Sequence, residues 1–273
     1  MTQFPSFDAM AAYHTQSSLN DDMIMPRILD EIAASGNISE ARLPLRLIQG
    51  SLISLRFPEL VQELARQLQH FEEIPNYDPQ QDELSSGLDA TDPQMLRVVV
   101  HILIILQVVG ASSEEGTKYH KAAESVISGY VTTLGECDRF ELVPLYASRL
   151  SPENATAVVG KVLVHFTGDD AKREELIRQM YQYGVDAEAC LKKTMDITLE
   201  QTESCYATSI LERGMVFNGF GGEPQPEDRQ LIGGLEWLML AGAPLRRELI
   251  HSVCEVYKRF LRQLTPPPPA PDR

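Results

Sequence analysis

Hydrophobic residues recur every three or four positions along most of the chain, and no segment shows the strict alternation of a strand. The clearest example is FPELVQELARQLQHFEE, residues 57–73. This period predicts an amphipathic helix that buries one face. The apolar stripe consists of Phe57, Leu60, Val61, Leu64, Leu68 and Phe71, and the polar face carries Glu59, Glu63, Arg66 and Gln67.

The same pattern predicts helices over most of the remaining sequence, with short connections marked by Gly, Pro or Asn. Helices joined by short connections pack as antiparallel neighbours. Because no fixed repeat length is present, the expected fold is all-α, an irregular α-solenoid or coat-element-like stack of antiparallel helices. The expected ranges are 7–19, 22–34, 42–55, 57–73, 95–109, 112–134, 138–150, 153–166, 168–185, 186–199, 203–215, 227–241 and 243–264.

Two long connections and a terminal tail interrupt this helical pattern. Residues 74–93 are polar and turn-rich and residues 217–228 are rich in glycine and proline, so both are expected to be mobile loops. The tail TPPPPAPDR, residues 265–273, cannot be helical and is expected to be an extended linker. We therefore expect one elongated α-helical segment over residues 1–264, followed by the tail.

The chain contains 24 basic and 39 acidic residues and has a net charge of −15. Such an acidic chain argues against direct binding to nucleic acid or to an anionic membrane, because both partners carry negatively charged phosphates. The most apolar run, residues 95–109, is shorter than the roughly 20 residues that cross a bilayer, and it contains Arg97 and His101. We expect it to be a buried central helix.

No group of residues in the sequence forms a catalytic or metal-binding constellation. Asp169 and Asp170 follow Gly168 at a predicted helix start, where capping of the helix explains the carboxylates better than a metal does. The segment GFGG, residues 219–222, lacks both the preceding strand and the following Gly-Lys-Ser/Thr of a phosphate loop. The cysteines and histidines show no metal-ligand spacing, and the cysteines are expected to be buried thiols. These residues are Cys137, Cys190, Cys205 and Cys254, and His14, His70, His101, His120, His165 and His251. We expect no catalytic residue, no bound cofactor and no metal ligand.

Two further residues raise structural questions. Trp237 is the sole tryptophan and follows Gly233 and Gly234 by one helical turn. Its ring is expected to fill the space that these glycines leave. A role in partner binding is the alternative. Pro144 lies inside the predicted helix 138–150. Because proline is tolerated in the first turn but not in a helix interior, we expect the regular helix to start near Val143.

Four segments, in this order and spacing, resemble the nucleoporin 107 family, called nucleoporin 84 in budding yeast. The similarity extends from about residue 7 to residue 264, with gaps at the two long loops. Its most specific parts are the Leu-Tyr-x-x-x-Leu pattern at 145–150 and the Asp-Arg and Glu-Trp-Leu patterns at 228–229 and 236–238. The segments are RLIQGSLISLRFPELVQELARQL (46–68), LRVVVHILIILQVVG (96–110), LVPLYASRL (142–150) and EDRQLIGGLEWLMLAGAPLRRELIHSVCEVYKRFL (227–261).

The resemblance implies a structural role in the nucleus, at the nuclear pore complex of the nuclear envelope. Family members are α-helical scaffold subunits of the Y-shaped complex that coats the pore membrane, and so support transport of mRNA and protein. They bind a nucleoporin 96-type partner, called 145C in yeast, toward the N-terminal half and a nucleoporin 133-type partner at the C-terminal end. This chain resembles a middle-region fragment, so the nucleoporin 133 site is expected to be absent.

The family has no known catalytic residues to carry over to this sequence. The residues that face partners are not identifiable from the sequence. Two alternatives stay open at this point, an all-α metal-dependent enzyme that would use Asp169 and Asp170, and a cytosolic adaptor built from helical repeats.

Overall fold

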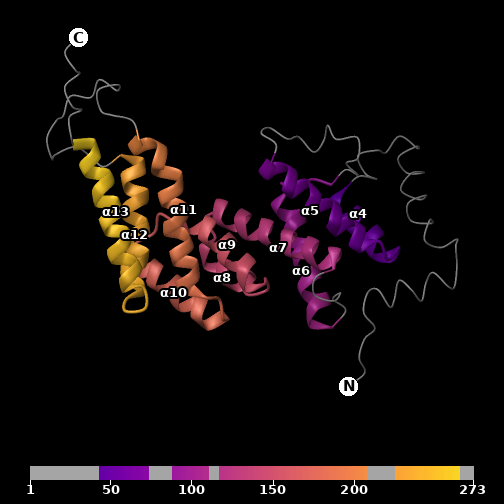
Figure 1. Cartoon of the computed structure of the whole chain (residues 1–273). Coiled ribbons are helices and arrows are strands. Elements are labelled where there is room, and N and C mark those ends of the chain that lie inside the picture. Colours follow the sequence, from indigo (N-terminus) through magenta and orange to yellow (C-terminus); the bar gives the residue numbers. More distant parts are fainter. Residues whose placement is uncertain (1–42, 74–87, 111–116, 208–224, 265–273) are drawn as a thin grey trace, which may run out of the picture. The chain divides into compact units, whose positions relative to one another are not determined.

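The structure is a computed structural model, and it describes residues 43–73, 88–110, 117–207 and 225–264. Within these ranges every regular element is a helix, which confirms the all-α fold class (Figure 1). The elements are α4 (Pro44–Ile53), α5 (Phe57–Glu73), α6 (Pro93–Val108), α7 (Lys118–Glu136), η3 (Phe140–Leu142), α8 (Val143–Ala147), α9 (Pro152–Leu163), α10 (Asp170–Tyr183), α11 (Ala187–Ala207), α12 (Pro226–Ala241) and α13 (Arg246–Leu264).

Several predictions fall outside the described residues. These are the helices 7–19 and 22–34, the glycine-rich segment 219–222, the tail 265–273, and most of the two predicted loops. The described end of the first loop is packed, since Leu88 and Ala90 are 4% and 2% exposed. The described end of the second loop, from Pro226, is the first turn of α12.

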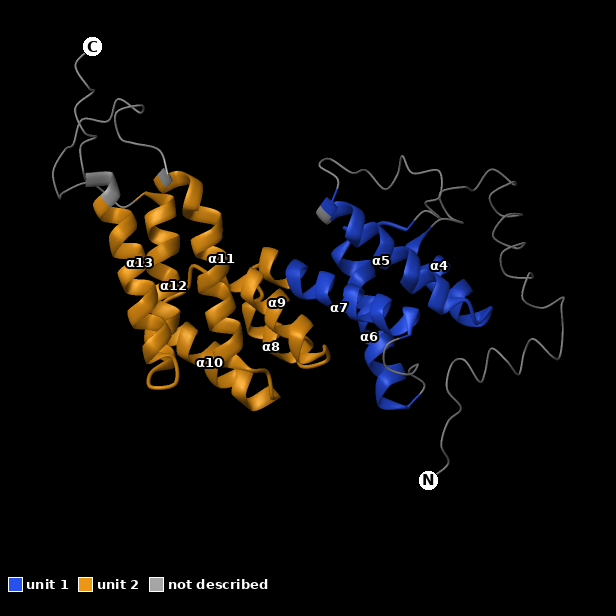
Figure 2. Ribbon diagram, viewed as in Figure 1, with its two compact units in different colours: residues 1–133 blue, residues 134–273 orange. Residues whose placement is uncertain are grey.

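The chain divides into two compact units, residues 1–133 and residues 134–273 (Figure 2). The helix α7 begins in the first unit, and its last residues, 134–136, fall in the second. The single elongated segment expected over residues 1–264 stays a prediction, and each unit is described by itself below.

The first unit is built on the amphipathic helix α5, whose predicted stripe is largely buried. Phe57, Val61 and Leu64 are fully buried, and α4 contacts both α5 and α6. The helices α5 and α7 approach closely at Gly129, where a Cβ atom would lie only 2.7 Å from Leu68 Cδ1. A glycine at this position therefore permits the two helices to pack.

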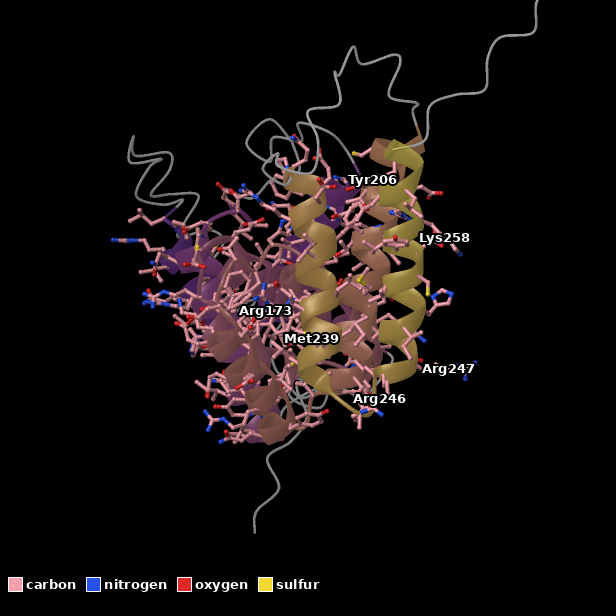
Figure 3. The ribbon with its side chains drawn as sticks, turned by 90° about the vertical axis from the view of Figure 1, so that its left-hand side faces the viewer. Arg173, Tyr206, Met239, Arg246, Arg247 and Lys258 are labelled. Carbon is pink, nitrogen blue, oxygen red and sulfur yellow. The ribbon has the colours of Figure 1, made fainter. Side chains whose placement is uncertain are left out.

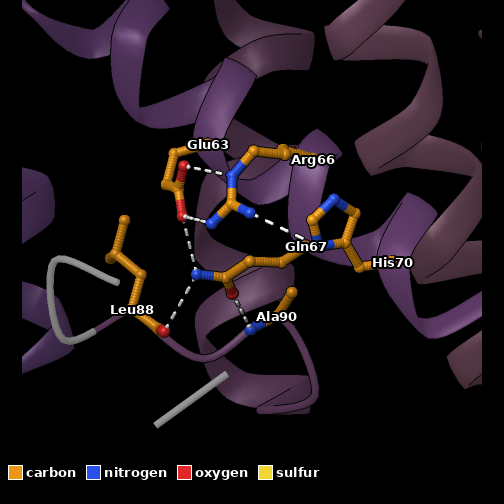
Figure 4. A network of polar contacts seen from close by, with 6 residues as sticks. All are labelled: Glu63, Arg66, Gln67, His70, Leu88 and Ala90. Atoms are coloured by element: carbon orange, nitrogen blue, oxygen red, sulfur yellow. Dashed lines mark hydrogen bonds and ion pairs between the residues drawn. The ribbon is translucent and has the colours of Figure 1, made fainter. Parts of the chain in front are cut away.

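A buried polar network ties α5 to the segment before α6 (Figure 4). The Gln67 side chain is fully buried. Its Nε2 donates to Glu63 Oε1 at 3.1 Å and to the Leu88 carbonyl at 3.3 Å, and its Oε1 accepts from the Ala90 N–H at 3.1 Å. Arg66 donates to the Glu63 carboxylate at 2.8 and 2.9 Å. The assignment of Gln67 to an exposed polar face is thus wrong, because residues 88–90 cover it.

The prediction that residues 95–109 form a buried helix holds only for the first half of α6. Met95, Leu96 and Val99 are buried, whereas Ile105 and Val108 are 60% and 72% exposed. His101 is also exposed, and its Nδ1 lies 2.6 Å from the backbone oxygen of Arg97. Hydropathy alone misassigned this half of the helix because a run that is apolar on every face does not indicate which faces have neighbours.

The second unit is organised around α11, which contacts α9, α10, α12 and α13. Two separate helices, 186–199 and 203–215, were predicted here, but α11 is continuous from Ala187 to Ala207. Three buried threonines on one face, Thr194, Thr198 and Thr202, each donate the hydroxyl to the backbone carbonyl four residues earlier. The hydroxyls are satisfied within the helix itself, so they can be buried without breaking it.

The short helix α8 answers the question raised by Pro144. A 3₁₀ turn covers Phe140–Leu142, and α8 starts at Val143 with Pro144 in its first turn. The late helix start is therefore confirmed. Proline is tolerated there because the backbone N–H groups of the first turn have no acceptor within the helix. Tyr146 and Leu150 are buried and Leu145 is half-buried.

Candidate partner-binding surface

The acidic pair at the start of α10 caps the helix and holds an arginine. The Asp169 side chain accepts from the Lys172 N–H at 2.9 Å, which is the geometry of an N-cap. Asp170 Oδ1 lies 3.3 Å from Arg173 Nη1. Both carboxylates thus have structural partners, and no group of three potential metal ligands gathers anywhere in the described ranges.

A cavity of about 470 Å³ lies beside α10, and its lining is mainly acidic and apolar. Four carboxylates, Asp138, Glu141, Asp169 and Glu175, line it together with Lys172. Asp169 is occupied by capping, and Glu175 pairs with Arg178 and accepts from Gln179. Among the described residues, the lining contains no histidine, cysteine or serine that would pair with these carboxylates as base or nucleophile.

The cysteines do not share the burial that was predicted for all four. Cys190 is fully buried, and burial raises the pKa of its thiol to about 12, which keeps it protonated and unreactive. Cys137 and Cys254 are exposed and Cys205 is partly exposed. The prediction is therefore wrong for the two exposed thiols, because Cys137 lies in the turn after α7 and Cys254 lies on an exposed side of α13.

Arg173 of α10 is buried against α12 and joins the two helices. Its guanidinium lies 5.6 Å from the centre of the Phe166 ring and 5.5 Å from that of the Trp237 ring. Its Nη2 pairs with Glu236 Oε2 at 2.9 Å, and Asp170 approaches from the first turn of α10. Trp237 is 1% exposed, which confirms the core role predicted from sequence. Arg173 was not singled out by sequence because its aromatic partners lie on other segments.

The helix α13 is held to α11 by a second buried arginine. Arg259 is 8% exposed, and its Nη1 donates to the Leu199 carbonyl at 2.8 Å and to Thr202 Oγ1 at 2.9 Å. Nearby, the Tyr206 hydroxyl donates to Asp228, which also accepts from the Gln225 N–H in the capping box of α12. These bonds connect α11, α12 and α13 and fix which side of α13 faces the core.

The opposite side of α13 is apolar and exposed to solvent. We call Ile250, Val253, Tyr257 and Leu261 the α13 face, and these residues are 60%, 44%, 61% and 43% exposed. Their spacing of three or four residues places them on one side of the helix. The core side carries Ser252, Val256 and Arg259 instead.

The neighbouring helix α12, which contacts α13, adds exposed apolar residues of its own. Ile232 and Met239 are seven residues apart on α12 and are 39% and 57% exposed. Figure 3 is turned to the side of the molecule where α12 and α13 lie, with Met239 labelled on α12. A cluster of exposed apolar residues, such as the α13 face, marks an interaction surface, whereas single exposed apolar residues are common.

Sequence reasoning left the partner-facing residues unassigned, and the α13 face shows why. An apolar stripe on a helix is ordinarily assigned to the core. The assignment changes only when Arg259 of α13 is seen to bind Leu199 and Thr202 of α11, which turns the other side of α13 inward. The sequence does show an apolar stripe on α13 and an arginine, Arg259, on the other side of the helix. It does not show that this arginine binds the Leu199 carbonyl of α11.

Comparisons with known proteins place this chain in a family. Residues 2–264 match the family described as nuclear pore protein 84 / 107. The chain is 27% identical over 296 residues to nucleoporin NUP84 of Chaetomium thermophilum, a match that covers 96% of the chain and 30% of that protein. It is 26% identical over 180 residues to nucleoporin nup107 of Schizosaccharomyces pombe, covering 63% of the chain and 20% of that protein.

The chain spans less than a third of the length of either relative. None of the helices in the described ranges combines the length and the apolar character needed to cross a membrane. The match to the family extends over nearly all of the sequence and includes both compact units. On this ground, the chain belongs to the nuclear pore protein 84 / 107 family.

Proposed function

We propose that this protein is a structural scaffold subunit of the nuclear pore complex, in the Y-shaped coat subcomplex at the nuclear envelope. Family membership supports this role, because the relatives are nucleoporins. In this role the two units form one scaffold segment over residues 1–264 that binds other nucleoporins and so supports transport of mRNA and protein. The protein acts without catalytic residues, cofactor or metal.

The observation that carries the proposal is the α13 face. A scaffold subunit needs apolar surface that is available to a neighbour, and α13 has it on the side away from its own core. Its position is rigid, because Arg259 binds α11 through two hydrogen bonds. A rigid, preorganised surface loses little conformational entropy on binding.

The partners that we propose are other Y-complex nucleoporins, with a nucleoporin 96-type protein, called 145C in yeast, as the first candidate. The test is co-elution of the purified chain with a recombinant nucleoporin 96-type partner in size-exclusion chromatography. Co-elution supports the proposal, whereas separate elution both of this chain and of a full-length family member contradicts it.

The metal-dependent enzyme is the alternative with a specific test. Adding Mg²⁺, Mn²⁺ or Zn²⁺ should leave the melting midpoint of the parent unchanged, and likewise that of Asp170→Asn, because the Asp170 carboxylate pairs with Arg173. Stabilisation by one of these ions that is lost in Asp170→Asn would revive the enzyme. The adaptor alternative is tested by cellular location, as described in the Discussion.

A further inference from the structure

The charges on α13 differ from those of the rest of the chain. The helix contains five basic and two acidic residues, a net charge of +3, in a chain whose net charge is −15. Arg259 is buried against α11, and the other basic residues with described side chains, Arg246, Arg247 and Lys258, are exposed. The exposed apolar face of α13 is therefore combined with local positive charge.

The basic residues lie along one edge of the α13 face. Arg247, His251 and Lys258 are separated by four and seven residues, so they share one flank of the helix beside Ile250 and Tyr257. Figure 3 shows Arg247 and Lys258 extending from α13 on the side away from α12. We call these three residues the basic flank.

The basic flank is largely available for a partner. Arg247 pairs with no carboxylate among the described residues, and Lys258 Nζ is 3.5 Å from Glu255 Oε2 with its side chain 63% exposed. An exposed ion pair at this distance contributes little and is easily exchanged for a better one. A partner carboxylate can therefore bind here without breaking a strong contact.

We propose that the α13 face binds an amphipathic helix of a neighbouring nucleoporin, with that helix placing acidic residues along the basic flank. This inference rests on the proposed scaffold function and adds the chemistry of the partner. Apolar residues of the partner cover Ile250, Val253, Tyr257 and Leu261, and its carboxylates pair with Arg247 and Lys258. Complementary charge at the edge sets the orientation and selects the partner, while the apolar centre supplies most of the affinity.

An anionic membrane is a poorer fit to the same helix. The remainder of the chain is strongly acidic, so a membrane that attracts α13 repels the rest of the protein. The helix is also fixed to α11 by Arg259 and cannot turn its apolar side independently of the unit. A helical protein partner needs only the local charge and the exposed stripe.

The test uses two synthetic helical peptides of roughly 20 residues, a length at which a leucine-striped helix can be stabilised. Both carry the same leucine stripe, and one has glutamates along one flank where the other has lysines. The full chain is titrated with each peptide in a fluorescence anisotropy assay. We expect the glutamate peptide to bind at least about tenfold more tightly, with an affinity that falls as salt is added.

Variants then assign the binding to named residues. Arg247→Glu should weaken the glutamate peptide and strengthen the lysine peptide, and Tyr257→Ser should weaken both. The control is Lys121→Glu, the same change of charge at an exposed residue of α7, which should leave both affinities unchanged. All three positions are exposed, so unchanged melting midpoints are expected to show that the variants fold.

Several outcomes would overturn the inference. They are no binding of either peptide, equal binding of both, binding insensitive to Arg247→Glu, a homodimer in sedimentation that Tyr257→Ser dissociates, or flotation with phosphatidylserine vesicles that Tyr257→Ser abolishes. If neither peptide binds but the chain co-elutes with a nucleoporin partner, only the proposed role of the α13 face is rejected. Peptide binding without any nucleoporin co-elution rejects the proposed scaffold function instead.

Discussion

Arg173 offers a sensitive test of how the second unit is held together, because it is the buried charge between α10 and α12. We consider replacement by alanine, which removes the guanidinium and the stem, and by methionine, which keeps an unbranched apolar stem of similar length. Both variants lose the ion pair to Glu236 at 2.9 Å and the contacts with the Phe166 and Trp237 rings. The alanine variant also leaves a cavity between the rings.

The expected cost follows from these contacts. A charge-assisted hydrogen bond contributes about 1.5 to 3 kcal/mol, and a largely desolvated cation–π contact about 1 to 2 kcal/mol. Glu236 and Asp170 are 36% and 64% exposed, so their carboxylates regain water and offset part of the loss. Arg173 Nε has no hydrogen-bond partner among the described residues, so removing it relieves a further cost. We expect Arg173→Met to lower the free energy of unfolding by about 1 to 2 kcal/mol and Arg173→Ala by about 3 kcal/mol.

The assay can use the protein's own tryptophan. Trp237 is the sole tryptophan of the chain and lies 5.5 Å from the guanidinium, so its fluorescence in a urea titration reports on the second unit. Arg178→Ala, on the same helix but with a side chain 72% exposed, is the matched control and should change the free energy by less than about 0.5 kcal/mol.

Two results would refute this reasoning. If Arg173→Met is as stable as the parent, the charge and its ring contacts do not stabilise the fold, as happens when a buried ion pair only offsets its own desolvation. If Arg173→Ala costs no more than Arg173→Met, the stem does not fill space between the rings. Either result would remove Arg173 from the account of α10 and α12.

Three further predictions concern other buried groups. Trp237→Ala should lower the free energy of unfolding by about 3 to 5 kcal/mol in circular dichroism melts, and an unchanged midpoint would contradict its packing in the core. Gln67→Ala should cost about 1 to 3 kcal/mol because it leaves buried backbone groups unpaired, whereas the exposed Gln69→Ala should cost little in the same melts. Burial raises the pKa of Cys190 above the ordinary value of 9.0, so the unfolded state loses its proton first as the pH rises. The contribution of Cys190 to stability should therefore be constant below about pH 9 and be lost above it, so in urea titrations the stability of the parent should fall more steeply above about pH 9 than that of Cys190→Ala. An equal fall in both proteins would contradict this assignment.

The bounds of a helix could be predicted from the sequence where local signals set them. The helix α5 was predicted with its full bounds because its stripe and its first-turn Pro58 are local signals. Pro144 likewise located the start of α8 through its own stereochemistry. The continuity of α11 was missed because its polar stretch around Thr202 resembles a connection until the hydroxyls are seen to bond within the helix.

The candidate surface could not be predicted because burial depends on contacts distant in sequence. Leu199 and Arg259 are 60 residues apart, and their hydrogen bond turns the polar side of α13 inward and the apolar side outward. Similarly, Gln67 is buried by residues 88–90, which follow a long polar segment. A helical pattern identifies two faces of a helix, but tertiary contacts decide which one is covered.

The central claim is that the protein is a scaffold of the nuclear pore, and its location in living cells tests this most directly. A fluorescently tagged full-length protein should form a continuous rim at the nuclear envelope, with slow recovery after photobleaching because a scaffold subunit exchanges slowly. Diffuse cytosolic fluorescence with rapid recovery, in cells that also lack the untagged protein, would contradict the claim and favour a cytosolic adaptor.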